Sequence, residues 1–166
     1  MTYAELILPE FDQEMANTRK VLERVPDDRL GWKSTPKSNS IGWVMSHLVE
    51  IPGWVEGTLT SDTWDIAPVG GEAYKTPIFG SRQEALEAFD RNVATARKQI
   101  AVTSDAEFHK SWSLLMGGQP VITLPKSGVI RTWVLNHTIH HRAYLLSYLR
   151  QLEIPVPGMY GPSGDE

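Results

Sequence analysis

Two histidines in one segment have the type and spacing to bind a metal ion together. His137 and His141 lie four positions apart in LNHTIHHRAYLLSYL, and side chains at positions i and i+4 of a helix share one face. A rotation of about 100° per residue places His141 about 40° from His137, inside the apolar side of the predicted helix. His140 falls about 60° to the other side of His137, so we expect that it is not a ligand.

A third imidazole lies on a second predicted helix. His47 occurs in SIGWVMSHLVEIPGWV, among apolar residues that flank it at helical spacing. Neutral imidazole is a common ligand of zinc, nickel and iron(II), and three protein ligands leave coordination positions open for water or substrate. The pattern alone leaves two interpretations open. Either His47, His137 and His141 form a metal site, or they are buried histidines with a packing role.

Two charged residues beside these histidines are further candidates. Glu50 follows His47 by one helical turn, so it is a candidate to orient that ring or to act as a general base. The alternative for Glu50 is a solvent-exposed position on the helix. Arg142 is a candidate to bind an anion or to pair with a carboxylate, and the alternative is a surface cation. Its angle, about 140° from His137, places it away from the predicted metal face.

Composition excludes several classes of protein. The 166 residues contain no cysteine, which excludes disulfides, thiolate catalysis and cysteine-ligated metal sites. The net charge of −4 argues against a protein that binds nucleic acid by neutralising phosphates. No apolar run reaches the roughly 18 residues of a membrane span, and acidic residues stand where a secretory signal would be basic. We therefore expect a cytoplasmic protein with no membrane partner.

The hydrophobic pattern predicts an all-α four-helix bundle that forms a single domain over residues 1–166. Helices are expected over about 3–24, 41–59, 81–102 and from after Gly128 to about 152. Pro52 should interrupt the second helix, and Ser81 with Glu84 should cap the third. Residues 60–80 are expected to form a long crossover loop, and 112–124 a short hairpin-like excursion before the last helix. Three tryptophans are expected in the core: Trp43, Trp54 and Trp133.

The chain resembles the DinB/YfiT superfamily of metal-binding four-helix bundles. The resemblance depends on SIGWVMSHLVEIPGWV at 40–55, on VLNHTIHHRAYLLSYLR at 134–150 and on the ending IPVPGMYGPSGDE. It implies that the metal ligands are His47, His137 and His141, and that His140 is the adjacent histidine that the family does not use as a ligand. The family usually has Gly-Gln after the arginine, where this chain has Ala143-Tyr144. The pocket wall beside the metal is therefore expected to differ.

The resemblance implies two classes of function. In the first, a divalent zinc, nickel or iron ion activates a thiol or a water molecule, and the protein is a thiol S-transferase or a hydrolase acting on a small-molecule substrate. A low-molecular-weight thiol would then be the cosubstrate, which agrees with the absence of cysteine. In the second, the protein is a non-catalytic metal-binding scaffold of a stress response. Relatives are commonly dimers, so a homodimer is expected in either class.

Overall fold

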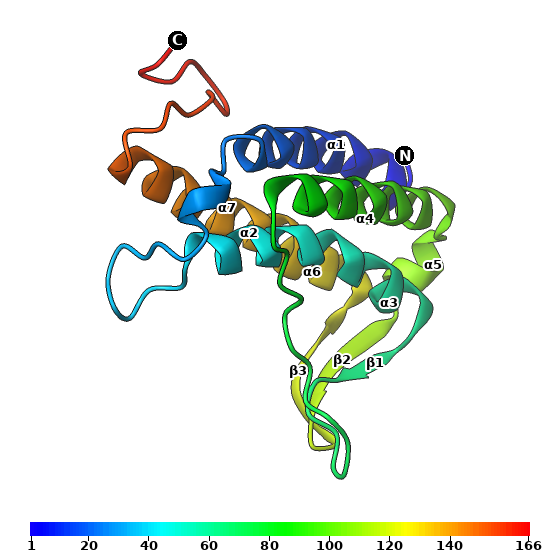
Figure 1. Ribbon diagram of the computed structural model, residues 1–166. Coiled ribbons are helices and arrows are strands. Elements are labelled where there is room, and N and C mark those ends of the chain that lie inside the picture. Colours follow the sequence, from blue (N-terminus) through cyan, green and yellow to red (C-terminus); the bar gives the residue numbers. More distant parts are fainter.

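Four helical segments form most of the computed structural model, which describes residues 1–166. They are α1 (Tyr3–Leu22), α2 (Ile41–Glu50) with its continuation α3 (Trp54–Thr60), α4 (Arg82–Val102) and α7 (His137–Gln151). Both α1 and α2 pack against α4 and against α7, so each segment has two helical neighbours (Figure 1). The expectation of four long helices is confirmed, but a small sheet projects from one side of them.

The helices begin where the sequence places capping side chains. Ser40 Oγ accepts a hydrogen bond from the backbone N–H of Trp43 at the start of α2, and Ser81 Oγ accepts one from Glu84 before α4. The structure also has a capping box at the start of α1, between Thr2 and Glu5. Pro52 lies in a single 3₁₀ turn between α2 and α3, because proline cannot donate the helical hydrogen bond.

The three-stranded sheet shows that the all-α prediction is incomplete. β1 (Thr63–Asp65) runs parallel to β2 (Ser111–Met116), which pairs antiparallel with β3 (Gln119–Pro125). The predicted hairpin over 112–124 is confirmed as β2 and β3. The prediction that residues 60–80 form only a loop is wrong, because β1 lies within them. This strand could not be recognised from its own residues, since it has no periodic hydrophobic pattern and pairs with a segment fifty residues away.

A two-glycine turn joins β2 to β3. Gly117 and Gly118 have φ of 61° and 76°, values that a tight hairpin turn requires and that other residues adopt only at a cost. Both backbone N–H groups donate to the carboxylate of Asp65, at 3.2 and 2.7 Å. The short β1 is thereby connected to the hairpin at two places, through its ladder with β2 and through this carboxylate.

The last helix is not uniform. It starts as α6 (Lys126–Val129) directly after β3, continues as a π-helical segment (Ile130–Asn136) and becomes α7 at His137. The expected start after Gly128 is therefore late by three residues. π-Helical turns are wider than α-helical turns, so the constant rotation assumed for this region does not hold before His137.

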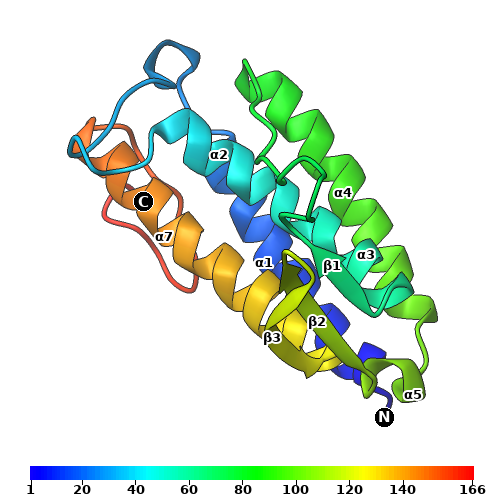
Figure 2. The same ribbon diagram turned by 90° about the horizontal axis from the view of Figure 1, so that it is seen from below.

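One hydrophobic core of 28 buried residues joins the four helical segments. Phe11 of α1, Leu48 of α2, Phe89 of α4 and Leu149 of α7 are among its fully buried members. Two short helical pieces, a 3₁₀ turn at Asp27–Arg29 and α5 (Asp105–Phe108), connect longer elements. The sheet contacts α3 and α6 and lies beside them in Figure 2. None of the helices has the length and the apolar composition needed to cross a membrane.

Candidate metal centre

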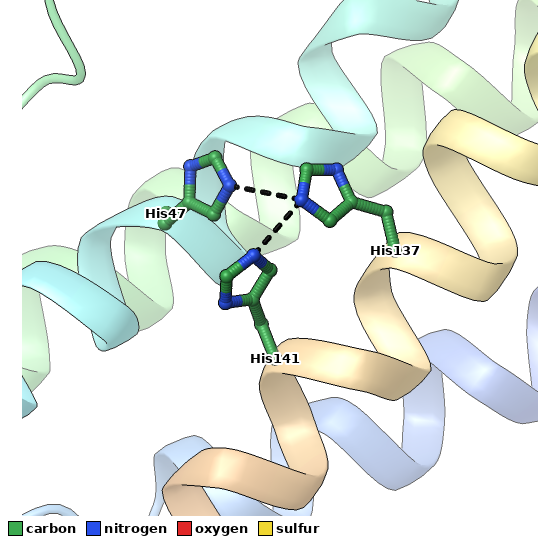
Figure 3. Close-up of side chains that lie close together, drawn as sticks. All are labelled: His47, His137 and His141. Carbon is green, nitrogen blue, oxygen red and sulfur yellow. Dashed lines mark hydrogen bonds between the residues drawn. The ribbon is translucent and has the colours of Figure 1, made fainter. Parts of the chain in front are cut away.

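The three predicted histidines converge on one point between α2 and α7. His137 Nε2 lies 3.4 Å from His47 Nε2 and 2.9 Å from His141 Nε2 (Figure 3). One nitrogen from each ring lies within 4.8 Å of the other two, and no other group belongs to this cluster. Three imidazole nitrogens that have only one another as partners form a donor set that fits a divalent ion. The histidine cluster is therefore compatible with a metal site.

The two histidines of α7 lie at the edge of its buried face. Thr138, Arg142 and Leu145 are fully buried, whereas His137 and His141 are half-buried. Taking His137 as 0°, the buried face is centred at roughly 100°, and not at the 20–40° that the apolar residues alone indicate. This position at the edge lets both rings contact α2 and still reach open space.

His47 is oriented by a buried carboxylate on its own helix. Its Nδ1 donates to Glu50 Oε1, so Nε2 presents its lone pair to the other two histidines. The second oxygen, Glu50 Oε2, accepts from the hydroxyl of Tyr74. The Glu50 side chain is only 4% exposed, which excludes the solvent-exposed alternative. Trp43 stacks on the His47 ring at 4.7 Å between ring centroids and restricts its rotation.

Burial keeps two of the three histidines neutral. Burial, together with the smaller effect of nearby His47, lowers the pKa of His137 to about 4 and that of His141 to about 3. Neutral imidazole is the form that binds metal, so the apoprotein is ready for an ion at neutral pH. Burial and the Glu50 carboxylate also raise the pKa of Tyr74 to about 12, so its phenol remains a hydrogen-bond donor.

An apolar cavity of about 210 Å³ opens beside the cluster. His47, Glu50 and two threonines are the polar residues of its lining, which also has five aromatic side chains: Trp54, Trp64, Tyr74, Trp112 and Trp133. On the other side of His141 lies a more polar hollow of about 350 Å³, whose lining includes Lys37, Asn39 and His140. The histidine cluster is thus bordered by two spaces of different chemistry.

The remaining candidates separate into those near the cluster and those away from it. His140 is exposed and stays outside the cluster, as expected. Arg142 is not a surface cation. It is buried and donates to Glu14 Oε2 at 2.6 Å, and this pairing with a carboxylate was one of the two interpretations. The expectation that Trp54 and Trp133 belong to the core holds only in part: Trp54 packs against the core, but both rings line the cavity.

Sequence reasoning missed the part of the site that comes from the sheet and its flanking loop. Trp64 lies on β1 and Trp112 on β2, while Tyr74 lies in the segment between β1 and α4. The one available signal was the high tryptophan content, which did not show where the rings would gather. Their convergence depends on the long-range pairing of β1 with β2.

Comparisons with known proteins find one family model and several proteins of similar sequence or fold. A family model described as the DinB superfamily matches residues 10–145. YrdA, an uncharacterized protein of Bacillus subtilis, is 26% identical over 96% of this chain and 89% of its own length. A crystal structure of a DinB-like protein from Bacillus cereus superposes with a TM-score of 0.73 at 23% identity, covering 94% of this chain and 97% of the other. A DinB-like protein of Bacillus subtilis, YjoA, superposes with a TM-score of 0.70 at 12% identity, covering 93% and 96%.

Proposed function

The chain belongs to the DinB superfamily, and from this membership and the geometry of the histidine cluster we propose that it is a metal-dependent enzyme acting on a small molecule. His47, His137 and His141 would hold one divalent ion of zinc, nickel or iron through their Nε2 atoms. Bound there by neutral ligands, the ion would supply a Lewis acid that acidifies a thiol or a water molecule.

The observation that carries this proposal is the apolar cavity at the cluster. A scaffold whose metal ion only braces α2 against α7 has no use for open space at its ligands. Here a cavity of about 210 Å³ reaches His47, and a second hollow of about 350 Å³ reaches His141. Apolar pockets with a few polar groups in their lining are typical of small-molecule sites.

Glu50 acts in this proposal as a positioning residue and not as a catalytic base. Its two oxygens accept hydrogen bonds from His47 and from Tyr74, and these contacts hold the carboxylate against the His47 ring. Carboxylates that orient a histidine in this way support many metal sites. Because no other carboxylate lines the cavity, we favour thiol transfer over hydrolysis.

The second, polar hollow supports a thiol cosubstrate. It borders His141 on the side away from the apolar cavity, and Lys37, Asn39 and Tyr144 offer it one cation and several hydrogen-bonding groups. Low-molecular-weight thiols carry charged and polar groups that such a surface can bind. The chain itself supplies no thiol, since it contains no cysteine.

Metal analysis followed by an activity screen tests the proposal. We expect one divalent ion per chain in the purified protein and metal-dependent transfer from at least one low-molecular-weight thiol to an electrophile. If metal-loaded protein shows no turnover with varied thiols and esters, and metal removal sharply lowers its melting temperature, the non-catalytic stress-response scaffold replaces the enzyme. The family resemblance also implies a homodimer, and sedimentation equilibrium measures the oligomeric state directly. A cytoplasmic location stays a prediction from the composition of the chain.

A further inference from the structure

We propose that the part of the substrate held beside the histidine cluster is an uncharged aromatic group. This inference deepens the proposed function, since it names the chemical class that the enzyme would act on. It depends on the walls of the apolar cavity, on the charges near them and on the size of the space.

The walls of the cavity are aromatic on several sides. Trp54 contacts His47 and His137, with ring centroids 5.5 and 5.6 Å apart, and Trp64 lies 6.3 Å from Trp54. Tyr74 then meets Trp64 edge-on at 4.7 Å. These rings form a continuous surface from the histidine cluster to the sheet. Aromatic rings prefer edge-on and offset contacts with other rings, so this surface suits a planar guest.

The charges around the cavity favour a neutral guest. No lysine or arginine lines it, so an anionic group inside would have no partner. The one carboxylate in the lining, Glu50, already accepts two hydrogen bonds. A cationic group would also lie next to a divalent ion whose three ligands are neutral. Charged parts of a substrate are therefore expected at the histidines or in solvent, and not among the tryptophans.

The size of the cavity fits a small ring system. An engineered protein cavity of about 150 Å³ binds benzene. The space here is about 210 Å³, which leaves room for a substituted or fused pair of rings. The reactive end of such a molecule would point toward His47, because that residue is the member of the histidine cluster that lines the cavity.

The accessory elements of the fold all contribute to this cavity. Leu114 of β2 and Ile122 of β3 are cross-strand partners, and both line it. The π-helical segment places Trp133 edge-on to His137, with centroids 5.8 Å apart. π-Helical turns occur often at functional sites. The sheet and the wide helical turn thus act together as walls that the four helices alone would not provide.

The experiment measures binding of matched probes by isothermal titration calorimetry. The neutral probe is 2-naphthol, and its comparators are the anion 2-naphthalenesulfonate, the cation trimethylanilinium and the saturated analogue decahydro-2-naphthol. In metal-loaded protein we expect 2-naphthol to bind about 100-fold more tightly than the anion, which finds no cation in the lining, and more tightly than the cation, which would lie beside the divalent ion. We expect it to bind several-fold, on the order of five-fold, more tightly than the saturated analogue, because ring contacts add to burial.

Variants that fill the cavity locate the binding. Leu114→Trp and Ile122→Trp each place a bulky ring in the space and should weaken 2-naphthol binding by about tenfold or more, since the probe loses its place. Leu115→Trp, at the neighbouring position of β2 that does not line the cavity, is the matched control and should bind as the wild type does. Circular dichroism and metal content establish that each variant is folded.

The outcomes separate this inference from the proposed function. Equal or tighter binding of a charged probe, equal binding of the saturated analogue, or binding that both cavity-filling variants leave unchanged overturns the aromatic assignment. Metal analysis is independent of these results, because the cavity walls need no ion and metal-stripped protein should still bind 2-naphthol. Protein that binds the probe but no metal would overturn the proposed enzyme and leave the assigned guest in place.

Discussion

Glu50 joins the histidine cluster to the cavity wall through a single carboxylate. It accepts from His47 on α2 and from Tyr74 in the segment before α4, so two distant parts of the chain meet at one buried group. We expect Glu50→Gln to lower metal affinity by about 10- to 100-fold, because an amide orients His47 less strongly. A competition titration against a metal-binding dye measures this change.

The control for that variant is Glu56→Gln, which alters an exposed glutamate of α3. It should leave metal affinity unchanged. Tyr74→Phe removes only the second hydrogen bond of Glu50 and should have a smaller effect than Glu50→Gln. Wild-type affinity in Glu50→Gln would show that His47 keeps its orientation through Trp43 alone.

Adjacent histidines on α7 should respond differently to substitution. His141→Ala removes one of the three convergent nitrogens and should abolish stoichiometric metal binding. His140→Ala removes an exposed ring outside the cluster and should retain it. Elemental analysis of the purified variants gives the answer. Metal retained in His141→Ala and lost in His140→Ala would mean that the cluster is not the metal site.

The depressed pKa values of His137 and His141 predict how the metal-free protein responds to acid. An unfolded histidine titrates near 6.5, whereas these two titrate at about 4 and about 3 in the fold. Between these values the unfolded chain binds more protons than the folded chain. Stability should therefore be complete above about pH 6.5 and should fall as the pH drops toward 4.

Urea unfolding of the apoprotein across this pH range measures the effect. His141→Gln, which cannot titrate, should show a shallower loss of stability than the wild type. His109→Gln, which alters an exposed histidine, is the control and should keep the wild-type slope. Parallel slopes for wild type and His141→Gln would contradict the prediction.

At the scale of single residues, the sequence predicted the donor set better than its surroundings. The i, i+4 spacing of His137 and His141 is a local property that any α-helix preserves, so it could be recognised without a structure. The burial of Glu50 could not, because it depends on Tyr74 arriving from 24 positions away. The tryptophan walls likewise depend on contacts between segments distant in the chain.

At the scale of elements, a buried ion pair fastens α7 to α1. Arg142 Nη2 donates to Glu14 Oε2 at 2.6 Å and Nη1 to the Glu14 carbonyl at 3.0 Å, and the side chains are 2% and 6% exposed. Tyr160 from the C-terminal segment also donates to the Glu14 carboxylate. Because α7 carries two histidines of the cluster, this pair holds the cluster against the rest of the fold.

We expect Arg142→Met to lower the free energy of unfolding by about 3 kcal/mol, because it leaves Glu14 buried without its cation. The double variant Arg142→Met, Glu14→Leu should recover much of this loss, since it removes the buried charge as well. Arg24→Met, at an exposed arginine, is the control. Urea unfolding measures all three, and a loss below about 1 kcal/mol for the single variant would contradict this account.

The elements that sequence patterns predicted well are those whose signals are local. Ser40, Ser81 and Pro52 mark a helix start, a second start and a break, and each acts on its own neighbours. The π-helical segment and β1 were missed. The π-helical segment could not be recognised because a shift of its hydrogen bonds by one residue leaves the hydrophobic pattern almost unchanged. β1 could not be recognised because it has only three residues, too few to show an alternating pattern.

At the scale of the whole molecule, the shared core predicts cooperative unfolding. One cluster of 28 buried residues joins all four helical segments, and the sheet is attached to it through α3 and α6. We expect one thermal transition, with far-ultraviolet circular dichroism and tryptophan fluorescence changing together. The first reports the helices and the second reports mainly the cavity walls. A fluorescence change that precedes the loss of helix would contradict the prediction of a single domain.

The overall arrangement could be predicted only in part. Helical periodicity extends over most of the chain and indicated the four helical segments. The contacts of the C-terminal segment could not be predicted from helical periodicity. It has no regular structure, yet Asn17 donates to the Met159 carbonyl at 3.2 Å and Tyr160 reaches the buried pair. These contacts form between the two ends of the chain, which no local pattern relates.

The histidine cluster is carried by helices, whereas much of the cavity wall is carried by the sheet, and this division affects how the substrate specificity of such proteins can change in evolution. The three clustered histidines are on α2 and α7, whereas Leu114, Ile122 and Trp64 belong to strands that contribute none of them. Substitutions in these strands can change the shape of the cavity while the histidine nitrogens keep their positions. Substitutions in the β2–β3 hairpin alone could then change which substrates bind. Mutant libraries for laboratory evolution of this protein should therefore be confined to β2 and β3.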